Sequence, residues 1–226
     1  MDPGRHRTHP DGAAADRGRR RKPVSPDRIR AVILAAALLG WSAVAPRIPL
    51  RWHPLPHAVV GTAAAVSARS ALGLRPPEVV RGLRWGSAAA AAVAATVAGS
   101  TRVAPVRAGI AAGTLPDSTA RWMLLRIPFG TVWSEEATYR AALGAAAARA
   151  FGASGGRWFT AAIFGLSHVP DARATGQSIP GTVLVTGAAG WIFAWLYDRS
   201  GSLAAPMLAH LAVNEAGAVA AVALRR

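Results

Sequence analysis

The chain opens with a strongly polar stretch and then alternates between long apolar runs and short polar segments. Residues 1–30 are rich in Arg, Pro, Gly and Asp and contain no aromatic residue, so they bury too little apolar surface to fold. Beyond them, several runs of mostly Ala, Val, Leu and Ile approach the ~20 residues that a helix needs to cross a bilayer. This pattern predicts an all-α polytopic transmembrane helical bundle behind a disordered basic tail.

Apolar runs of this length predict about seven to eight membrane segments. The first, 29–45, is expected to be a retained anchor, because the basic stretch before it is too long for a signal peptide. Further spans are expected at about 57–74, 83–100, 120–148, 157–170, 176–197 and 203–224, with a re-entrant or interfacial piece at 103–114. We therefore divide the chain into a tail (1–30), N-terminal transmembrane helices (31–115) and a motif-bearing membrane domain (116–226).

Composition supports a membrane location. Apolar residues make up 52% of the chain and charged residues 16%, against roughly 25% charged in soluble domains. The net charge of +15 comes almost entirely from arginine, and much of it precedes or separates the apolar runs. That distribution is typical of loops held on the cytoplasmic side and predicts a cytoplasmic N-terminus rather than nucleic-acid binding. Abundant Arg and Ala with a single lysine indicate a high-GC bacterium, and hence a bacterial cytoplasmic membrane.

Side chains able to do chemistry concentrate in three short motifs inside apolar runs, where an ionisable group is costly and normally functional. The motifs are Glu135-Glu136-Ala-Thr-Tyr-Arg140, Phe164-Gly-Leu-Ser-His168 and His210-Leu-Ala-Val-Asn214. On a helix, Glu136 and Arg140 share a face and are positioned to pair, while Glu135 points about 100° away. One arginine satisfies only one carboxylate well, so Glu135 is the candidate general base.

Each motif alone also has a structural interpretation: an ion pair with a stray acid, a packed core histidine, or polar contacts between helices. Together, they require a shared polar cavity inside the bundle. Two chemistries are open there. A zinc ion held by Glu135, His168 and His210 could activate water, or a carboxylate could deprotonate water while imidazole and amide stabilise the oxyanion. The motif His-Glu-x-x-His is absent, so a zincin fold is not supported, and the lack of cysteine excludes thiolate nucleophiles.

The order Glu-Glu-x-x-x-Arg, Phe-x-x-x-His, His-x-x-x-Asn resembles the CPBP family of CAAX-protease and bacteriocin-processing intramembrane endopeptidases, also called the Abi family. Residues 190–210 are similar to the family's approach to its last motif, with an aromatic-rich helix, an Arg-Ser-Gly turn and a proline before His210. The resemblance covers about residues 120–217. Two positions depart mildly from the family's pattern, since Ala141 replaces a common glycine and Tyr139 a common phenylalanine.

The resemblance implies a role for each motif residue. Glu135 would activate water and His168 would help to hold it. His210 and Asn214 would stabilise the oxyanion, while the ion pair of Glu136 with Arg140 would orient the site. The family has been described both as zinc metalloproteases and as glutamate-dependent proteases, so zinc remains an open expectation, with the three ligands named above.

We therefore expect an intramembrane endopeptidase that acts on a peptide, a bacteriocin-like precursor or a membrane protein. One alternative is a non-catalytic membrane scaffold or bacteriocin-immunity protein of the same fold. A second is a proton-coupled carrier, because intramembrane Glu and His also form proton relays. Carriers often show two related halves, and no long internal repeat is visible in this sequence.

Overall fold

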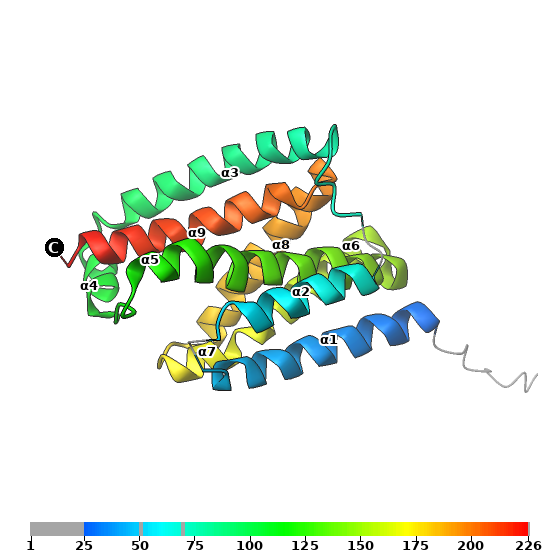
Figure 1. Ribbon diagram of the computed structural model, residues 1–226, viewed down its shortest axis with the longest axis horizontal. Helices are drawn as coiled ribbons and strands as arrows, with labels where there is room; N and C mark the ends of the chain where they lie inside the picture. The colour runs from blue at the N-terminus through cyan, green and yellow to red at the C-terminus, as the bar shows by residue number, and fades with distance from the viewer. Residues whose placement is uncertain (1–24, 50–51, 69–70, 226) are drawn as a thin grey trace, which may run out of the picture.

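The computed structural model describes residues 25–49, 52–68 and 71–225. Throughout these residues the chain forms helices and connecting turns without a strand, which confirms the all-α prediction (Figure 1). The first helix begins at Pro26, inside the predicted tail, because the Ser25 hydroxyl caps it by accepting a hydrogen bond from the backbone amide of Arg28 at 3.3 Å. The rest of the predicted tail, residues 1–24, lies outside the described residues.

Most helices follow the predicted runs. They are α1 (Pro26–Val44), α2 (Leu55–Ser67), α3 (Glu78–Ser100), α4 (Ala104–Ala112), α5 (Thr119–Arg121), α6 (Ala145–Ser167), α7 (Val169–Ala174), α8 (Ile179–Ser200) and α9 (Ala204–Ala223). A short 3-10 turn, Ala45–Arg47, follows α1. Two π-helical segments, η2 (Trp122–Trp133) and η3 (Glu136–Gly144), join α5 to α6. Residues 119–151 therefore form one helix, the motif helix, which ends at Gly152 with a φ of 75°.

The motif helix continues through Pro128. Proline lacks a backbone N–H and disrupts α-helical hydrogen bonding, and the wider π-helical pattern is one way to accommodate such a residue. Hydroxyl groups bond carbonyls of this helix too: Ser134 Oγ donates to Gly130 O at 2.6 Å, and Thr138 Oγ1 donates to Ser134 O at 2.8 Å. The first motif thus sits on an unbroken helix.

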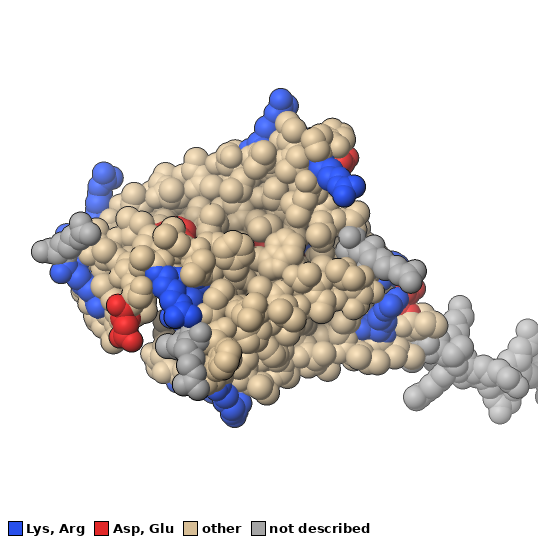
Figure 2. Space-filling model, in the orientation of Figure 1, with Lys and Arg blue, Asp and Glu red and all other residues tan. Residues whose placement is uncertain are grey.

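Three helices are long and apolar enough to cross a membrane: Pro26–Arg47, Ile179–Ser200 and Ala204–Ala223. A fourth candidate is the pair α3 and α4, which bends by 98° at the position where the sequence suggested a re-entrant or interfacial piece. By length and composition, the described residues therefore hold three or four candidate spans. Helix α2 ends at Ser67 and is shorter than the span expected at 57–74. One face of the molecule is largely uncharged, with arginines mainly near its edges (Figure 2).

Small residues let the helices approach closely, as expected in lipid. Helix α3 lies along α9 (Figure 1), and its Gly82 and Gly86 face Ser202 and Ala205 at the start of α9. Helix α2 packs on the motif helix through Gly61 and Ala65, two small residues one turn apart that are both buried. These contacts hold α2 as a wall beside the first motif.

Replacing Gly61 with alanine is expected to push α2 away from the motif helix. An added Cβ would lie 2.7 Å from Ser134 Cα, a backbone atom that cannot move aside cheaply. We expect a loss of ~1–3 kcal/mol in stability, measured as a lower melting temperature in detergent. Gly40→Ala in α1 is the matched control, since nothing lies within 4 Å of its added Cβ. An equal melting temperature for both variants would contradict this packing.

Candidate active site

A buried ion pair stands at the centre of the bundle. Arg140 Nε lies 3.0 Å from Glu136 Oε2, and both side chains are fully buried. The pair forms across one turn of the motif helix, as their four-residue spacing predicts. Glu136 Oε1 lies 2.7 Å from His210 Nδ1 on α9. The Glu136 carboxylate therefore joins two helices, forming an ion pair with a guanidinium and a hydrogen bond with an imidazole.

Aromatic rings surround the Arg140 guanidinium. Its Cζ lies 4.3 Å from the centroid of the Phe164 ring and 5.2 Å from that of Phe193. A cation gains more from an aromatic face when both are removed from water. The charge of Arg140 is thus stabilised by one carboxylate and two rings, which holds the buried network in one arrangement.

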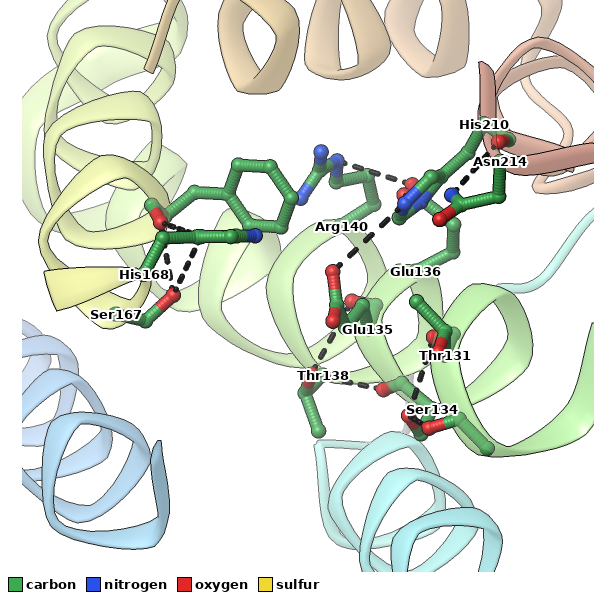
Figure 3. A network of polar contacts seen from close by, with 12 residues as sticks. Thr131, Ser134, Glu135, Glu136, Thr138, Arg140, Ser167, His168, His210 and Asn214 are labelled. Atoms are coloured by element: carbon green, nitrogen blue, oxygen red, sulfur yellow. Dashed lines mark hydrogen bonds and ion pairs between the residues drawn. The ribbon is translucent and has the colours of Figure 1, made fainter. Parts of the chain in front are cut away.

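Glu135 occupies a different environment from its neighbour. Its side chain is 27% exposed and lines a cavity of about 350 Å³ that is also bordered by Ser134, Tyr139 and His168. Its Oε2 lies 3.9 Å from His210 Nε2, too far for a direct hydrogen bond. Figure 3 shows the Glu135 carboxylate between His168 and His210. Of the two adjacent glutamates, Glu136 is held in the core and Glu135 is available to a bound molecule.

His168 stands at the C-terminal end of α6, where the helix stops and a short turn leads into α7. Its Nδ1 lies 2.8 Å from the carbonyl oxygen of Phe164. A carbonyl can only accept a hydrogen bond, so Nδ1 carries the proton and Nε2 is left as an acceptor. The ring also packs edge-on against Phe164, with centroids 4.8 Å apart. The orientation of His168 beside the cavity is therefore set by the second motif itself.

His210 is fixed by contacts on two sides. The Glu136 carboxylate accepts a hydrogen bond from Nδ1–H, and the ring stacks on Phe193 at 4.9 Å between centroids. Nε2 consequently faces Glu135. Asn214, one turn later, donates its side-chain amide to the carbonyl oxygen of His210 at 3.1 Å. In this arrangement Asn214 bonds its own helix, and it is not among the residues that line the cavity.

The structure brings the predicted residues together as two connected groups. Glu135 and His168 line the cavity, while Glu136, Arg140 and His210 form the buried network behind it, and the 3.9 Å approach of His210 to Glu135 links the two. Among the described residues, no three His, Asp or Glu side chains lie close enough together to hold a metal ion. Glu135, His168 and His210 thus do not form a three-residue metal site in this structure.

The arrangement of these motifs agrees with one family comparison. Residues 117–216 match the model of the Rce1-like type II CAAX prenyl endopeptidases. This region is similar to that family, and it covers less than half of the chain. No curated protein and no solved structure matches the chain. The Rce1-like domain includes the motif helix, α6 to α8 and most of α9, and therefore all six predicted site residues.

The Rce1-like domain does not form the cavity alone. Trp41 of α1 and two histidines, His53 and His57, also line it, and all three lie outside the matched region. Arg126 of the motif helix lies among them. Sequence reasoning did not assign these side chains to the site. The two histidines could have been found from their four-residue spacing at the start of an apolar run. Polar groups stand there where apolar ones are expected.

Proposed function

We propose that the protein is an intramembrane endopeptidase that hydrolyses a peptide bond with water activated by Glu135. The observation that supports this most directly is the unequal environment of the two adjacent glutamates. Glu136 is neutralised by Arg140 and His210, whereas Glu135 lines a cavity of about 350 Å³. A partly exposed carboxylate beside two imidazoles has the composition expected of a hydrolytic site.

In the proposed reaction, Glu135 takes a proton from a water molecule as the water oxygen bonds to the substrate carbonyl carbon. The carbonyl electrons move to its oxygen and form a tetrahedral oxyanion. Nε2 of His168 is an acceptor and helps to hold the water in place. As the C–N bond breaks, Glu135 returns the proton to the leaving nitrogen, so that protons balance.

The oxyanion is assigned to the side of His210. Its ring is held by Glu136 and Phe193, so little reorganisation is needed when charge develops. His210 acts in its doubly protonated form, in which Nδ1–H bonds Glu136 and Nε2–H donates to the oxyanion. Asn214 serves this role if its amide leaves the carbonyl of His210 when substrate binds. The ion pair of Glu136 with Arg140 keeps His210 in position.

His168→Ala is expected to lower kcat for peptide cleavage by about 10- to 100-fold while leaving the protein folded, since this ring borders the cavity without joining the buried ion pair. The assay uses purified detergent-solubilised protein and a small library of apolar peptides. His53→Ala is the control for loss of an imidazole from the same cavity. Unchanged cleavage in His168→Ala would remove this residue from the mechanism. A cellular phenotype that survives loss of Glu135 would favour the scaffold or immunity protein.

Zinc binding stays a prediction, and the same assay tests it. If catalysis uses only groups of the protein itself, a zinc chelator should leave the cleavage rate unchanged. Loss of cleavage with a chelator, restored by added zinc, would instead assign the ion to Glu135, His168 and His210 and would require these side chains to move together. Zinc would then act on the water as a Lewis acid.

We further propose that the chain crosses a bacterial cytoplasmic membrane seven or eight times with its N-terminus in the cytoplasm. Helices α2, α3 and α6 and the motif helix would add four spans to the three recognised by length and composition. The excess of arginine ahead of α1 supports this orientation. A tag placed at the N-terminus should resist a membrane-impermeant label in intact cells and react once the cells are opened. Labelling from outside would reverse the orientation.

A further inference from the structure

A groove lies between α1 and α2 at the end of the bundle where α1 begins. Helix α1 packs mainly on α6, while α2 packs on the motif helix, so the two helices stand apart along part of their length (Figure 1). The groove has a volume of about 740 Å³, and Ala146 of the motif helix borders it. It shares no lining residue with the cavity beside Glu135. The groove is therefore separate from the candidate active site.

The sides of this groove are apolar. Ile29, Ile33 and Leu34 line it from α1, and Ile33 is 62% exposed. Three alanines line it from α2, and their small side chains leave the space between the helices open: Ala63, Ala64 and Ala68. The part of α1 that borders the groove, residues 26–34, is about 12 Å long. An exposed apolar groove of this kind marks a binding surface, and its shape suits a hydrocarbon chain.

One end of the groove is basic. Arg30 stands near the start of α1 and Arg149 near the end of the motif helix, and both side chains are exposed. Asp27 Oδ1 lies 3.6 Å from Arg149 Nε, which shows that these two helix ends meet. Among the described residues, no ion pair involves Arg30. With two guanidinium groups and one carboxylate, this end of an apolar groove carries an excess positive charge.

We propose that the groove binds an anionic phospholipid, with one acyl chain between α1 and α2 and the phosphate at Arg30 and Arg149. Guanidinium groups bind phosphate through paired hydrogen bonds, and the apolar sides bury the chain. A zwitterionic lipid gains less, because its headgroup amine adds a positive charge beside the arginines. The site goes beyond the proposed function, since it requires a membrane but no peptide cleavage.

The test is photolabelling of the purified, detergent-solubilised protein by a phosphatidylglycerol that carries a diazirine on one acyl chain. Unlabelled dioleoyl phosphatidylglycerol and dioleoyl phosphatidylcholine then compete for the site. We expect phosphatidylglycerol to compete roughly 30-fold more strongly, since each of two arginines near a membrane surface favours an anionic lipid by about 5-fold. Labelled peptides identified by mass spectrometry should contain residues from the two sides of the groove, 26–34 and 63–68. Glycerophosphoglycerol, the headgroup without acyl chains, should not compete.

Charge variants test the headgroup contact. Arg30→Gln should weaken competition by phosphatidylglycerol about 5-fold and leave phosphatidylcholine unchanged, whereas Arg30→Lys should keep most of the preference. Arg107→Gln is the matched control, because Arg107 is an exposed arginine on α4, at the opposite end of the bundle from the start of α1 (Figure 1). It should keep the full preference.

A second pair of variants tests the acyl-chain contact. Ala63→Phe places a large side chain in the groove and should weaken both lipids alike, without a change in charge. Val66→Phe is its control, since Val66 lies on the same helix, is 70% exposed and does not line the groove. Melting temperatures in detergent show whether each variant is folded.

Four results would overturn the lipid site: no photolabelling of the two segments, equal competition by the two lipids, an unchanged preference when Arg30 and Arg149 are both glutamine, or competition by the headgroup alone that equals that of the whole lipid. The last result would assign the arginines to a free phosphate group. The endopeptidase proposal fails separately, because no part of this test depends on cleavage. A protein that cleaves no peptide but prefers phosphatidylglycerol through Arg30 retains the lipid site.

Discussion

Glu135→Gln is expected to lower kcat by about 10²- to 10⁴-fold, the range that a general base contributes. Glutamine keeps the size and hydrogen-bonding capacity of glutamate but cannot take a proton from water. Folding should be unaffected, because Glu135 is 27% exposed and its nearest ionisable partner, His210, lies 3.9 Å away. A large loss of turnover without a loss of stability is the result that separates catalysis from structure.

The measurement is single-turnover cleavage of a bound peptide, together with melting temperature in detergent. Glu215→Gln is the matched control. This glutamate lies on α9 beside Asn214 but faces an apolar groove between α3 and α9 rather than the cavity. It should retain full activity. Cleavage at the normal rate by the Glu135→Gln protein would mean that another group activates the water.

The second large effect is expected from Arg140→Met. Removing the guanidinium leaves the Glu136 carboxylate buried with only His210 beside it, and breaking a buried pair in this way typically costs ~3–5 kcal/mol. For a chain of this size, that loss lowers the melting temperature by roughly 6–20 °C. Activity should fall as well, since the network that orients His210 is disturbed.

Replacing both members of the pair tests whether the unpaired charge causes the loss. The double variant Glu136→Leu with Arg140→Met leaves no isolated charge and should regain part of the stability, while activity stays low because a leucine side chain cannot accept the hydrogen bond from His210 Nδ1–H. Arg157→Met is the control. Arg157 pairs with Asp198, whose side chain is 45% exposed. Loss of this pair should lower the free energy of unfolding by about 1 kcal/mol or less. A similar small shift for Arg140→Met would show that its ion pair contributes little to the fold.

Local features of this protein could be predicted from sequence. The pairing of Glu136 with Arg140 follows from helix geometry, which depends only on spacing. Gly61 and Ala65 indicated a close helix contact because small residues at four-residue spacing expose backbone along one face. The gap between the spans expected at 120–148 and 157–170 contains Gly152, where the motif helix ends with a positive φ.

Continuity of the motif helix was decided by the tertiary structure. Arg126 and Pro128 interrupt the apolar run in sequence, but the π-helical segment carries the chain through both positions. Helices α2 and α9 pack on this segment. Hydrophobicity alone does not report which hydrogen-bonding pattern a packed helix adopts.

The sequence alone identified which residues form the site, but not how they are arranged. Which side chains meet depends on contacts between segments far apart in the chain, such as His210 with Glu136, and these are set by helix packing rather than by spacing. Packing also determines that the Asn214 amide donates to the carbonyl oxygen of His210. It likewise determines that His53 and His57 line the cavity of Glu135. The sequence by itself determined the helices and the chemistry they carry, and only the tertiary structure decided which of these groups share one cavity.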